Sequence, residues 1–506
     1  MISVNTLPDE VLLLIFDHYV NERINNPSYV NERINDASLM NGDINDAPYV
    51  IERREELWQS LVHVCCRWRS IVFGSPRHLK LQLVCQERTP ARDTLDVWPA
   101  LPLVIWCRGP DERGSVDNII AGLERRDRVC QIILVGTRTP YLEILLAAMQ
   151  QPFPELTHLV ISPYINDYLV PVFPKSFLGG SAPRLEYLKL NRIPFPRLPK
   201  LLLSATHLTH LCLSNIPNSG YFSPKAIATA LSVLTSLERL TLQFQSSPWL
   251  DRASRRPPPS TRSVLPVLGY FRFNGATKYL EDLVARIDSP RLNALEIVFS
   301  GEIVFHTRQL IQFINRTPMS RALEEANITF YDVSVEFNFG VLSQTSSYGR
   351  LDVEIYHRGL DRQLLSVAQV CTSCLPPLTI LQDLFIYEQL HQDWNDNIEN
   401  GLWLQLLHPF TAVKNLYLSK EVALRIGSAL QDSELAEGGT TEVLPALQNL
   451  FLEGLESWEP VVQEGIAMFV AARQVASRPI AVSHWDGLDS DQDDSFQNYS
   501  FQDDSD

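Results

Sequence analysis

The sequence of 506 residues has no long hydrophobic run. The run that most resembles a targeting or membrane segment covers residues 11–16 (VLLLIF), far fewer than the roughly 20 residues that a membrane-spanning helix needs. Asp9 and Glu10 stand directly before this stretch, where a secretory signal would carry basic residues. We therefore expect neither a membrane span nor a signal peptide, and we expect a cytoplasmic or nuclear location.

Basic charge is also scarce. The chain has 43 Lys and Arg against 59 Asp and Glu, which gives a formal net charge of -16. This balance argues against nucleic acid as a partner, because nucleic-acid binding requires a basic surface, and it disfavours anionic membranes. Residues 485–506 hold eight Asp and no Lys or Arg, and we predict that they form an acidic disordered tail.

Cysteines and catalytic motifs are few. Eight Cys in 506 residues without a secretory signal are typical of reduced thiols. Cys371 and Cys374 form a single C-x-x-C pair, whereas a structural zinc needs four ligands. No phosphate-binding loop, nucleophile elbow, dinucleotide fingerprint or zinc-protease motif is found. The sequence therefore predicts no catalytic residue, no metal site and no cofactor, and we expect that the chain is not itself an enzyme.

A repeated pattern, apolar-x-x-apolar-x-apolar, fills most of the chain. Each copy predicts a short strand whose alternate residues face one core. Copies recur every 23 to 34 residues, and those at 265, 323 and 348 are accepted mainly on their spacing. The copies begin at Val129, Leu156, Leu185, Leu208, Leu237, Leu265, Leu292, Leu323, Tyr348, Leu381, Val413 and Leu447.

Helical segments separate these strands. Examples are residues 141–149, 224–234, 278–287, 307–315 and 364–370. A strand and a helix that alternate with a period near 29 residues are typical of a leucine-rich repeat. We therefore predict an α/β solenoid, a horseshoe, over residues 76–484. The Asn or Cys that usually follows the strand is mostly replaced, which predicts an irregular solenoid. Segments 79–84 and 103–106 are predicted as strands that cap its start.

The N-terminal region predicts helices around an insert. Thr6 and the apolar face that starts at Leu7 predict a first helix, and residues 55–73 predict a second helical stretch that ends at Gly74. Between them, residues 19–54 hold tandem decapeptides such as YVNERINNPS and YVNERINDAS. We interpret this insert as an expanded surface loop, because short polar copies cannot bury a core.

The two helical stretches resemble an F-box. Residues 7–12 (LPDEVL), 15–16 (IF) and 61–69 (LVHVCCRWR) match the pattern L-P-x-E-x-L-x-x-I-F followed by V-C-x-x-W-R. The chain is similar to a large family of F-box proteins in mushroom-forming fungi, in which an F-box precedes degenerate leucine-rich repeats. This resemblance implies a three-helix F-box at residues 1–75, an irregular solenoid after it and an overall α/β fold.

The resemblance further implies the substrate-recognition subunit of a Skp–cullin–F-box ubiquitin ligase. In such a complex the F-box docks onto a Skp-family adaptor, and through it onto a cullin-RING ligase, while the repeats bind a protein substrate. Sequence does not assign each F-box side chain to the core of this unit or to its docking surface. By motif position, the residues that form or support the adaptor surface are Leu7, Pro8, Leu12, Ile15, Phe16, Val64, Cys65 and Trp68.

Residues between the strand leucines are expected on the concave side of the solenoid, the usual binding surface of such arrays. We predict that substrate contacts come from Tyr187, Lys189, Arg239, Phe385, Tyr387, Tyr417 and Phe451. The other interpretation of the late aromatics is that terminal helices or the tail cover them. For the whole chain, the alternative function is a repeat scaffold with a vestigial F-box and no ligase role.

Overall fold

The computed structural model describes residues 7–22, 58–76, 78–88, 91–108, 116–167, 171, 173–245, 261–299, 307–321, 324–340, 349–373, 378, 380–389, 398–435, 443–454 and 460–485. The decapeptide repeats after residue 22 and the acidic tail after Trp485 lie outside the described residues. Two compact units divide the chain, Met1–Leu237 and Glu238–Asp506. Among the described helices, none combines the length and the hydropathy that a bilayer crossing requires.

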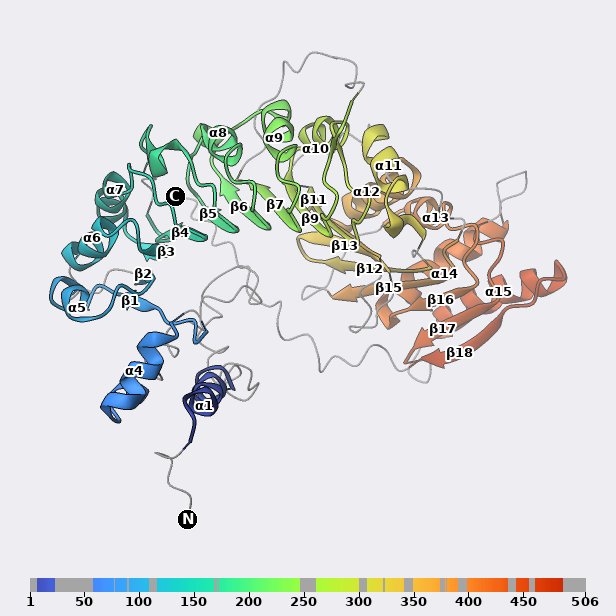
Figure 1. The fold of residues 1–506 in the computed structure, drawn as a ribbon. Helices are drawn as coiled ribbons and strands as arrows, with labels where there is room; N and C mark the ends of the chain where they lie inside the picture. Colours follow the sequence, from blue (N-terminus) through green and yellow to red (C-terminus); the bar gives the residue numbers. More distant parts are fainter. Residues whose placement is uncertain are drawn as a thin grey trace. The chain divides into compact units, whose positions relative to one another are not determined.

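In the described part of the first unit, the helices α1 (Asp9–Glu22) and α4 (Cys66–Gly74) and the helical residues 58–62 precede the parallel strands. The strands lie side by side in chain order as β1 (Leu83–Cys85), β2 (Leu103–Arg108), β3 (Val129–Thr137), β4 (His158–Pro163), β5 (Tyr187–Asn191) and β6 (His210–Ile216). Helices α5 (Ala91–Val97), α6 (Val116–Glu124), α7 (Thr139–Ala148), α8 (Leu198–Leu202) and α9 (Pro224–Leu231) connect them. These helices gather on one face of the sheet (Figure 1).

The second unit continues the strand-and-helix repeat. Its sheet has the order β7-β9-β11-β14-β13-β12-β15-β16-β17-β18. The strands are β7 (Arg239–Phe244), β9 (Tyr270–Gly275), β11 (Ala294–Phe299), β12 (Glu325–Tyr331), β13 (Ser334–Phe339), β14 (Arg350–Tyr356), β15 (Asp383–Gln389), β16 (Asn415–Leu418), β17 (Asn449–Glu453) and β18 (Ala481–Trp485). A separate short pair joins β8 (Ser263–Val264) to β10 (Ile287–Asp288).

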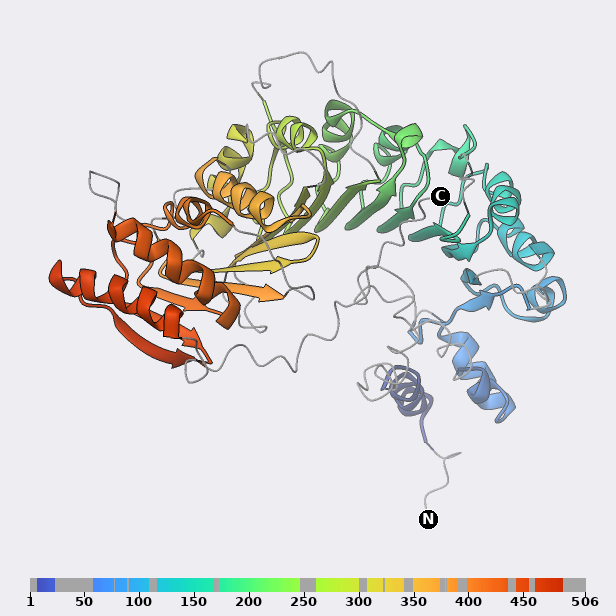
Figure 2. The same ribbon diagram turned by 180° about the vertical axis from the view of Figure 1, so that it is seen from behind.

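Helices of the second unit cover one face of its sheet, as both views show (Figures 1 and 2). They are α10 (Thr277–Val284), α11 (Arg308–Asn315), α12 (Leu360–Ser373), α13 (Asn400–Leu407), α14 (Lys420–Leu435) and α15 (Pro460–Val475). In α11 the buried side chains are Leu310, Phe313 and Ile314, one stripe at helical spacing. In β15 the buried Leu384 and Ile386 alternate with half-buried residues on the other face. We call the sheet face opposite the helices the open face.

The strand predictions from the repeat pattern are largely confirmed. Eleven of the twelve copies, all but the one at 265, begin at or two residues before an observed strand, and the predicted capping segments overlap β1 and β2. The copy placed at Leu265 is wrong by three residues, since β9 begins at Tyr270 and the repeat starts at Leu268. Leu265 and Leu268 are both fully buried, so the apolar pattern does not separate them.

Strands β12, β13 and β14 break the simple order of the array. Strand β13 lies antiparallel between β12 and β14, so that β14 pairs with β11 and β12 pairs with β15. Gln363 of α12 is fully buried and its side-chain amide donates to the backbone oxygens of Tyr331 and His357, at 2.9 and 2.8 Å. Tyr331 is the last residue of β12, and His357 directly follows β14. One side chain therefore holds the ends of both strands. We call β12, β13 and β14 the exchanged strands.

Both units thus have the parallel strand-and-helix repeat of an irregular leucine-rich-repeat-like α/β solenoid. Within each unit the core lies between the sheet and its helices, where the strand leucines and the helix stripes meet.

Candidate interaction surfaces

Helices α1 and α4 pack through a narrow apolar seam. The buried face of α1 consists of Leu12, Phe16 and Val20, spaced four residues apart. The ring of Phe16 lies 4.7 Å from that of Trp68 on α4, at an interplanar angle of 57°. Because Phe16 is fully buried, this contact fixes which face of α1 turns away from α4.

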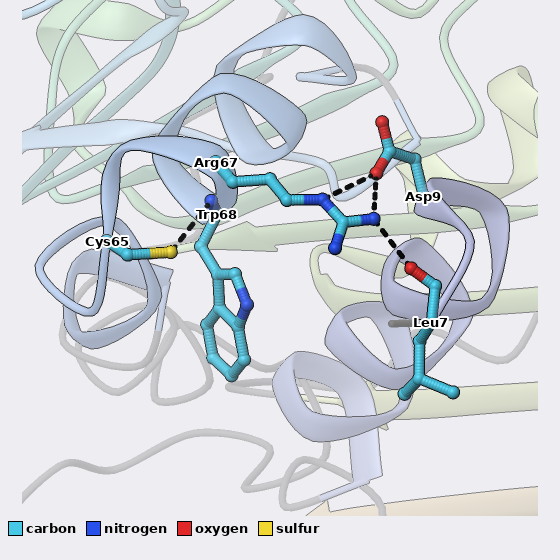
Figure 3. Close-up of polar contacts among 5 residues, drawn as sticks. All are labelled: Leu7, Asp9, Cys65, Arg67 and Trp68. Atoms are coloured by element: carbon cyan, nitrogen blue, oxygen red, sulfur yellow. Dashed lines mark hydrogen bonds and ion pairs between the residues drawn. The ribbon is translucent and has the colours of Figure 1, made fainter. Parts of the chain in front are cut away.

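An arginine joins the beginnings of the two helices (Figure 3). The Arg67 guanidinium donates from Nε and Nη2 to Oδ1 of Asp9, at 3.0 and 2.6 Å, and Nη2 also donates to the Leu7 backbone oxygen at 2.6 Å. Both side chains are more than a third exposed, so the ion pair contributes little to stability. Its effect is geometric, since it sets the position of the first turn of α1.

The predicted helical stretch 55–73 is broken. Residues 58–62 are helical, and α4 begins only at Cys66. Cys65 has an extended backbone and caps α4, with its Sγ accepting from the Trp68 amide at 3.5 Å (Figure 3). A residue that caps a helix lies outside it, and the interruption at 63–65 separates the stretch into two short helices. The part before residue 58 lies outside the described residues.

An aromatic cluster connects this region to the beginning of the repeats. Trp58 is buried and its ring lies 5.4 Å from Trp98 and 6.0 Å from Phe73, both edge-on. Trp98 follows α5, so the cluster joins the helical region to the first repeat. Trp98 was not predicted to have a role, because a single Trp after a short helix has no periodic signal.

An exposed apolar stripe runs along α1 on the side away from the seam. Val11, Leu14, Ile15 and Tyr19 are all more than a third exposed, with Leu14 reaching 64%. Their spacing of three and four residues places them on one helix face. Val64, in the interruption before α4, is exposed as well. Apolar side chains gathered on one face of a short helical region are typical of a docking surface.

The predicted adaptor-binding residues therefore fall into three environments. Pro8, Ile15 and Val64 are exposed, and Leu7, Cys65 and Trp68 are half-buried. Leu12 and Phe16 are fully buried in the seam, so they can support a docking surface only by positioning α1. Val11 and Tyr19 belong to the apolar face that helical spacing predicts from Leu7 onward, although they are not among the predicted adaptor-binding residues, and Leu14 was not singled out at all.

The predicted substrate residues of the early repeats, Tyr187, Lys189 and Arg239, lie in two different units. Tyr187 on β5 lies between two histidines, with its ring 5.9 Å from that of His158 and 5.7 Å from that of His210. Burial lowers the pKa of His158 below its usual value. Lys189 occupies the next position on the same face of β5. Arg239 belongs to the second unit, where its guanidinium lies 4.6 Å above the Tyr270 ring and makes a cation–π contact.

The late set is brought together as one aromatic row on the open face. Phe385, Tyr417 and Phe451 occupy matching register positions on β15, β16 and β17. Their rings stack nearly parallel, 4.1 Å apart between Phe385 and Tyr417 and 4.4 Å apart between Tyr417 and Phe451. Tyr387 lies two residues further along β15, with its ring 6.3 Å from that of Phe385. Stacking covers the inner ring faces, so the row presents ring edges to solvent.

Trp485 completes this aromatic row. The predicted start of the disordered tail at residue 485 is therefore wrong by one residue, because Trp485 is the last residue of β18. Its ring lies 5.5 Å from Tyr387, 5.5 Å from Tyr417 and 6.0 Å from Phe385. Burial, with a smaller effect of Glu453, raises the pKa of the Tyr387 phenol well above its usual value. The register of β18 with β17 pairs Trp485 with Glu453 and so places it on the open face. The sequence of β18, AVSHW, has no apolar and polar alternation that could have signalled this.

A polar ladder borders the aromatic row. The Asn415 side-chain amide donates to Asp383 at 2.6 Å, and that of Asn449 donates to Asn415 at 2.7 Å. These residues precede Phe385, Tyr417 and Phe451 by two positions on the same strands. The ladder fixes the neighbouring side chains, so the aromatic row is a preformed surface.

Comparisons with known proteins give little. No family model matches the chain, and no curated protein matches it. Among solved structures, the chain is similar to the leucine-rich-repeat-containing protein LegL7 from Legionella pneumophila. That likeness has 13% sequence identity and a TM-score of 0.26, over 77% of this chain and 97% of the other.

Proposed function

We propose that the chain is a substrate-recognition subunit of a Skp–cullin–F-box ubiquitin ligase. The proposal gives the N-terminal helices the role of an F-box that docks a Skp-family adaptor, and it gives the repeats the role of substrate receptor. It assigns no catalytic residue to the chain, since ubiquitin transfer belongs to the other subunits of such a ligase.

The observation that carries the proposal is the apolar stripe of α1. Four apolar side chains lie exposed on one face of a helix whose opposite face is fully packed. The F-box motif falls on this same helix and on α4, and Arg67 holds the two together at the motif residues Leu7 and Asp9. A preformed apolar face loses little freedom on binding, which favours affinity.

Adaptor binding by the full chain tests the proposal. The test variant is Val11→Glu with Ile15→Glu, which places two charges on the stripe without touching the seam. Each of these side chains would contribute about 1.5 kcal/mol on burial, so we expect at least a hundredfold weaker binding to purified Skp-family adaptor by calorimetry.

The matched control is Val97→Glu on α5, because Val97 is 79% exposed and lies outside the stripe. This control is expected to bind as the unchanged chain does. If the unchanged chain does not bind the adaptor, the ligase role is refuted, and the repeats are then those of a scaffold with a vestigial F-box. If the stripe variant binds normally, the docking surface lies elsewhere.

A further inference from the structure

The open face of the last strands in the second unit is acidic. Strands β12, β13, β15, β16, β17 and β18 contain no Lys or Arg. On their open face stand four carboxylates, at Glu325, Glu336, Asp383 and Glu453. The neighbouring β14 carries Arg350 as well as Asp352 and Glu354, so it is not counted in this acidic set. This face therefore carries a negative excess beside the aromatic row.

The acidity belongs to this face and is not a property of the whole array. Strands β3, β4, β5 and β6 of the first unit contain no Asp or Glu. They contain one basic residue, Lys189. The overall acidic composition of the chain thus does not produce the negative face. A surface with one sign of charge attracts a partner of the opposite sign.

The carboxylates flank the aromatic row on both sides. Asp383 precedes Phe385 by two residues, and its register partner Glu325 lies beside it on β12. Glu453 follows Phe451 by two residues on the other side of the row. Positions two apart on a strand are roughly 6.6 Å apart, which is within the span of a lysine or arginine side chain. The apolar stem of such a side chain would pack along the ring edges while its charged head reaches a carboxylate.

We propose that this face, from β12 to β17, binds an extended basic segment of a partner protein, one that carries several lysines or arginines. The inference rests on the proposed function, since it specifies the substrate class of the repeat domain. The chain's own acidic end is a poor occupant, because residues 486–506 hold eight Asp and no Lys or Arg. Nucleic acid is disfavoured by the same repulsion.

The test uses the full chain and a defined probe. The probe is a fluorescein-labelled dodecapeptide with four lysines separated by glycine and serine, and its counterpart carries acetyl-lysine at the same positions. We expect fluorescence anisotropy to detect binding of the lysine peptide that weakens with salt. The acetylated peptide should bind at least tenfold more weakly, because acetylation removes the charge and keeps the stem.

Neutral variants locate the binding face. The face variant combines Glu325→Gln, Glu336→Gln and Asp383→Asn. Loss of one exposed ion pair weakens binding by about two- to fivefold, so the three changes together should weaken it by roughly 10- to 100-fold.

The matched control variant combines Glu124→Gln, Asp127→Asn and Glu143→Gln. These three residues are exposed in the first unit, and the combination changes the net charge by the same amount. It should leave affinity unchanged. Equal loss in both variants, or equal binding of both peptides, would overturn the proposal.

A third variant ends at Trp485 and so lacks the acidic tail. Retained binding supports the face as the site, whereas loss of binding on this truncation alone would assign the peptide to the tail and overturn the inference. Adaptor binding is measured separately on the same preparations. A chain that binds the adaptor but not the lysine peptide refutes only this inference, and one that binds the peptide but not the adaptor refutes only the ligase role.

Discussion

Replacement of Asp352 by asparagine should change how the stability of the second unit depends on pH. Asp352 on β14 has a side chain that is 14% exposed and lies 2.5 Å from Nε of Arg350. Burial raises the pKa of its carboxyl from 3.8 to about 7, Arg350 acts in the opposite direction, and the nearby Glu296 and Glu336 raise it further. The folded chain therefore holds a proton on Asp352 at pH values where the unfolded chain has lost it.

The sign of the effect follows from proton linkage. Between pH 3.8 and about 7 the folded state binds more protons at Asp352 than the unfolded state does, so the free energy of unfolding falls as pH rises through this window. Asparagine cannot ionise, and Asp352→Asn removes this dependence. From pH 5 to a folded-state pKa of about 7 is two pH units, or about 3 kcal/mol at 1.36 kcal/mol per unit.

The measurement is the difference in unfolding free energy between Asp352→Asn and the unchanged chain, at pH 5 and at pH 8. Urea titrations followed by circular dichroism provide it, and Glu143→Gln on the exposed face of α7 is the control. The variant should gain about 3 kcal/mol relative to the unchanged chain between the two pH values. This comparison cancels any pH-independent effect of the amide. A gain below about 0.5 kcal/mol, or a loss, would show that Arg350 outweighs the burial of Asp352.

Two further predictions concern the first unit. Burial raises the pKa of the Cys107 thiol to about 12. Iodoacetamide at pH 8 should therefore alkylate the exposed Cys66 and leave Cys107 unmodified until the chain unfolds. Mass spectrometry of the native chain checks this, and rapid labelling of Cys107 would contradict it. At Gly220 an added Cβ would lie 2.7 Å from Cα of Pro194, so Gly220→Ala should destabilise the unit by about 1–3 kcal/mol in thermal unfolding. At Gly401 on α13 nothing lies within 4 Å of an added Cβ, so Gly401→Ala should leave the stability unchanged or raise it. A similar loss of stability in both variants would refute the steric explanation.

The repeats could be predicted from the sequence because their leucines recur at the same spacing and are all buried in the core. At Leu185, Leu208 and Leu381 the pattern places each strand within two residues, since each leucine is buried in the same core. Strand β13 was missed because its buried side chains, such as Phe337, alternate without the leucine spacing. Which strand pairs with which depends on long-range contacts, and a local pattern does not encode them.

The candidate surfaces were predicted in part. The aromatic row was found because Phe385, Tyr417 and Phe451 hold the same position in successive repeats. Trp485 lies outside the repeat pattern, and its place in the row depends on a side chain that reaches across neighbouring strands. In the N-terminal region, sequence could not separate the buried Phe16 from its exposed neighbours, because both kinds of residue are apolar.

The exchanged strands have a consequence for how this chain can evolve. A linear array gains or loses a repeat easily, because each repeat contacts only its two neighbours. Here Ala294 on β11 pairs with Arg350 on β14, and Glu325 on β12 pairs with Asp383 on β15. Deletion of residues 325–331 would leave β13 without one partner and would separate β15 from the strand it joins. We therefore expect the segment from β11 to β15 to be kept as one block, with duplication or loss of repeats confined to the stretches on either side of it.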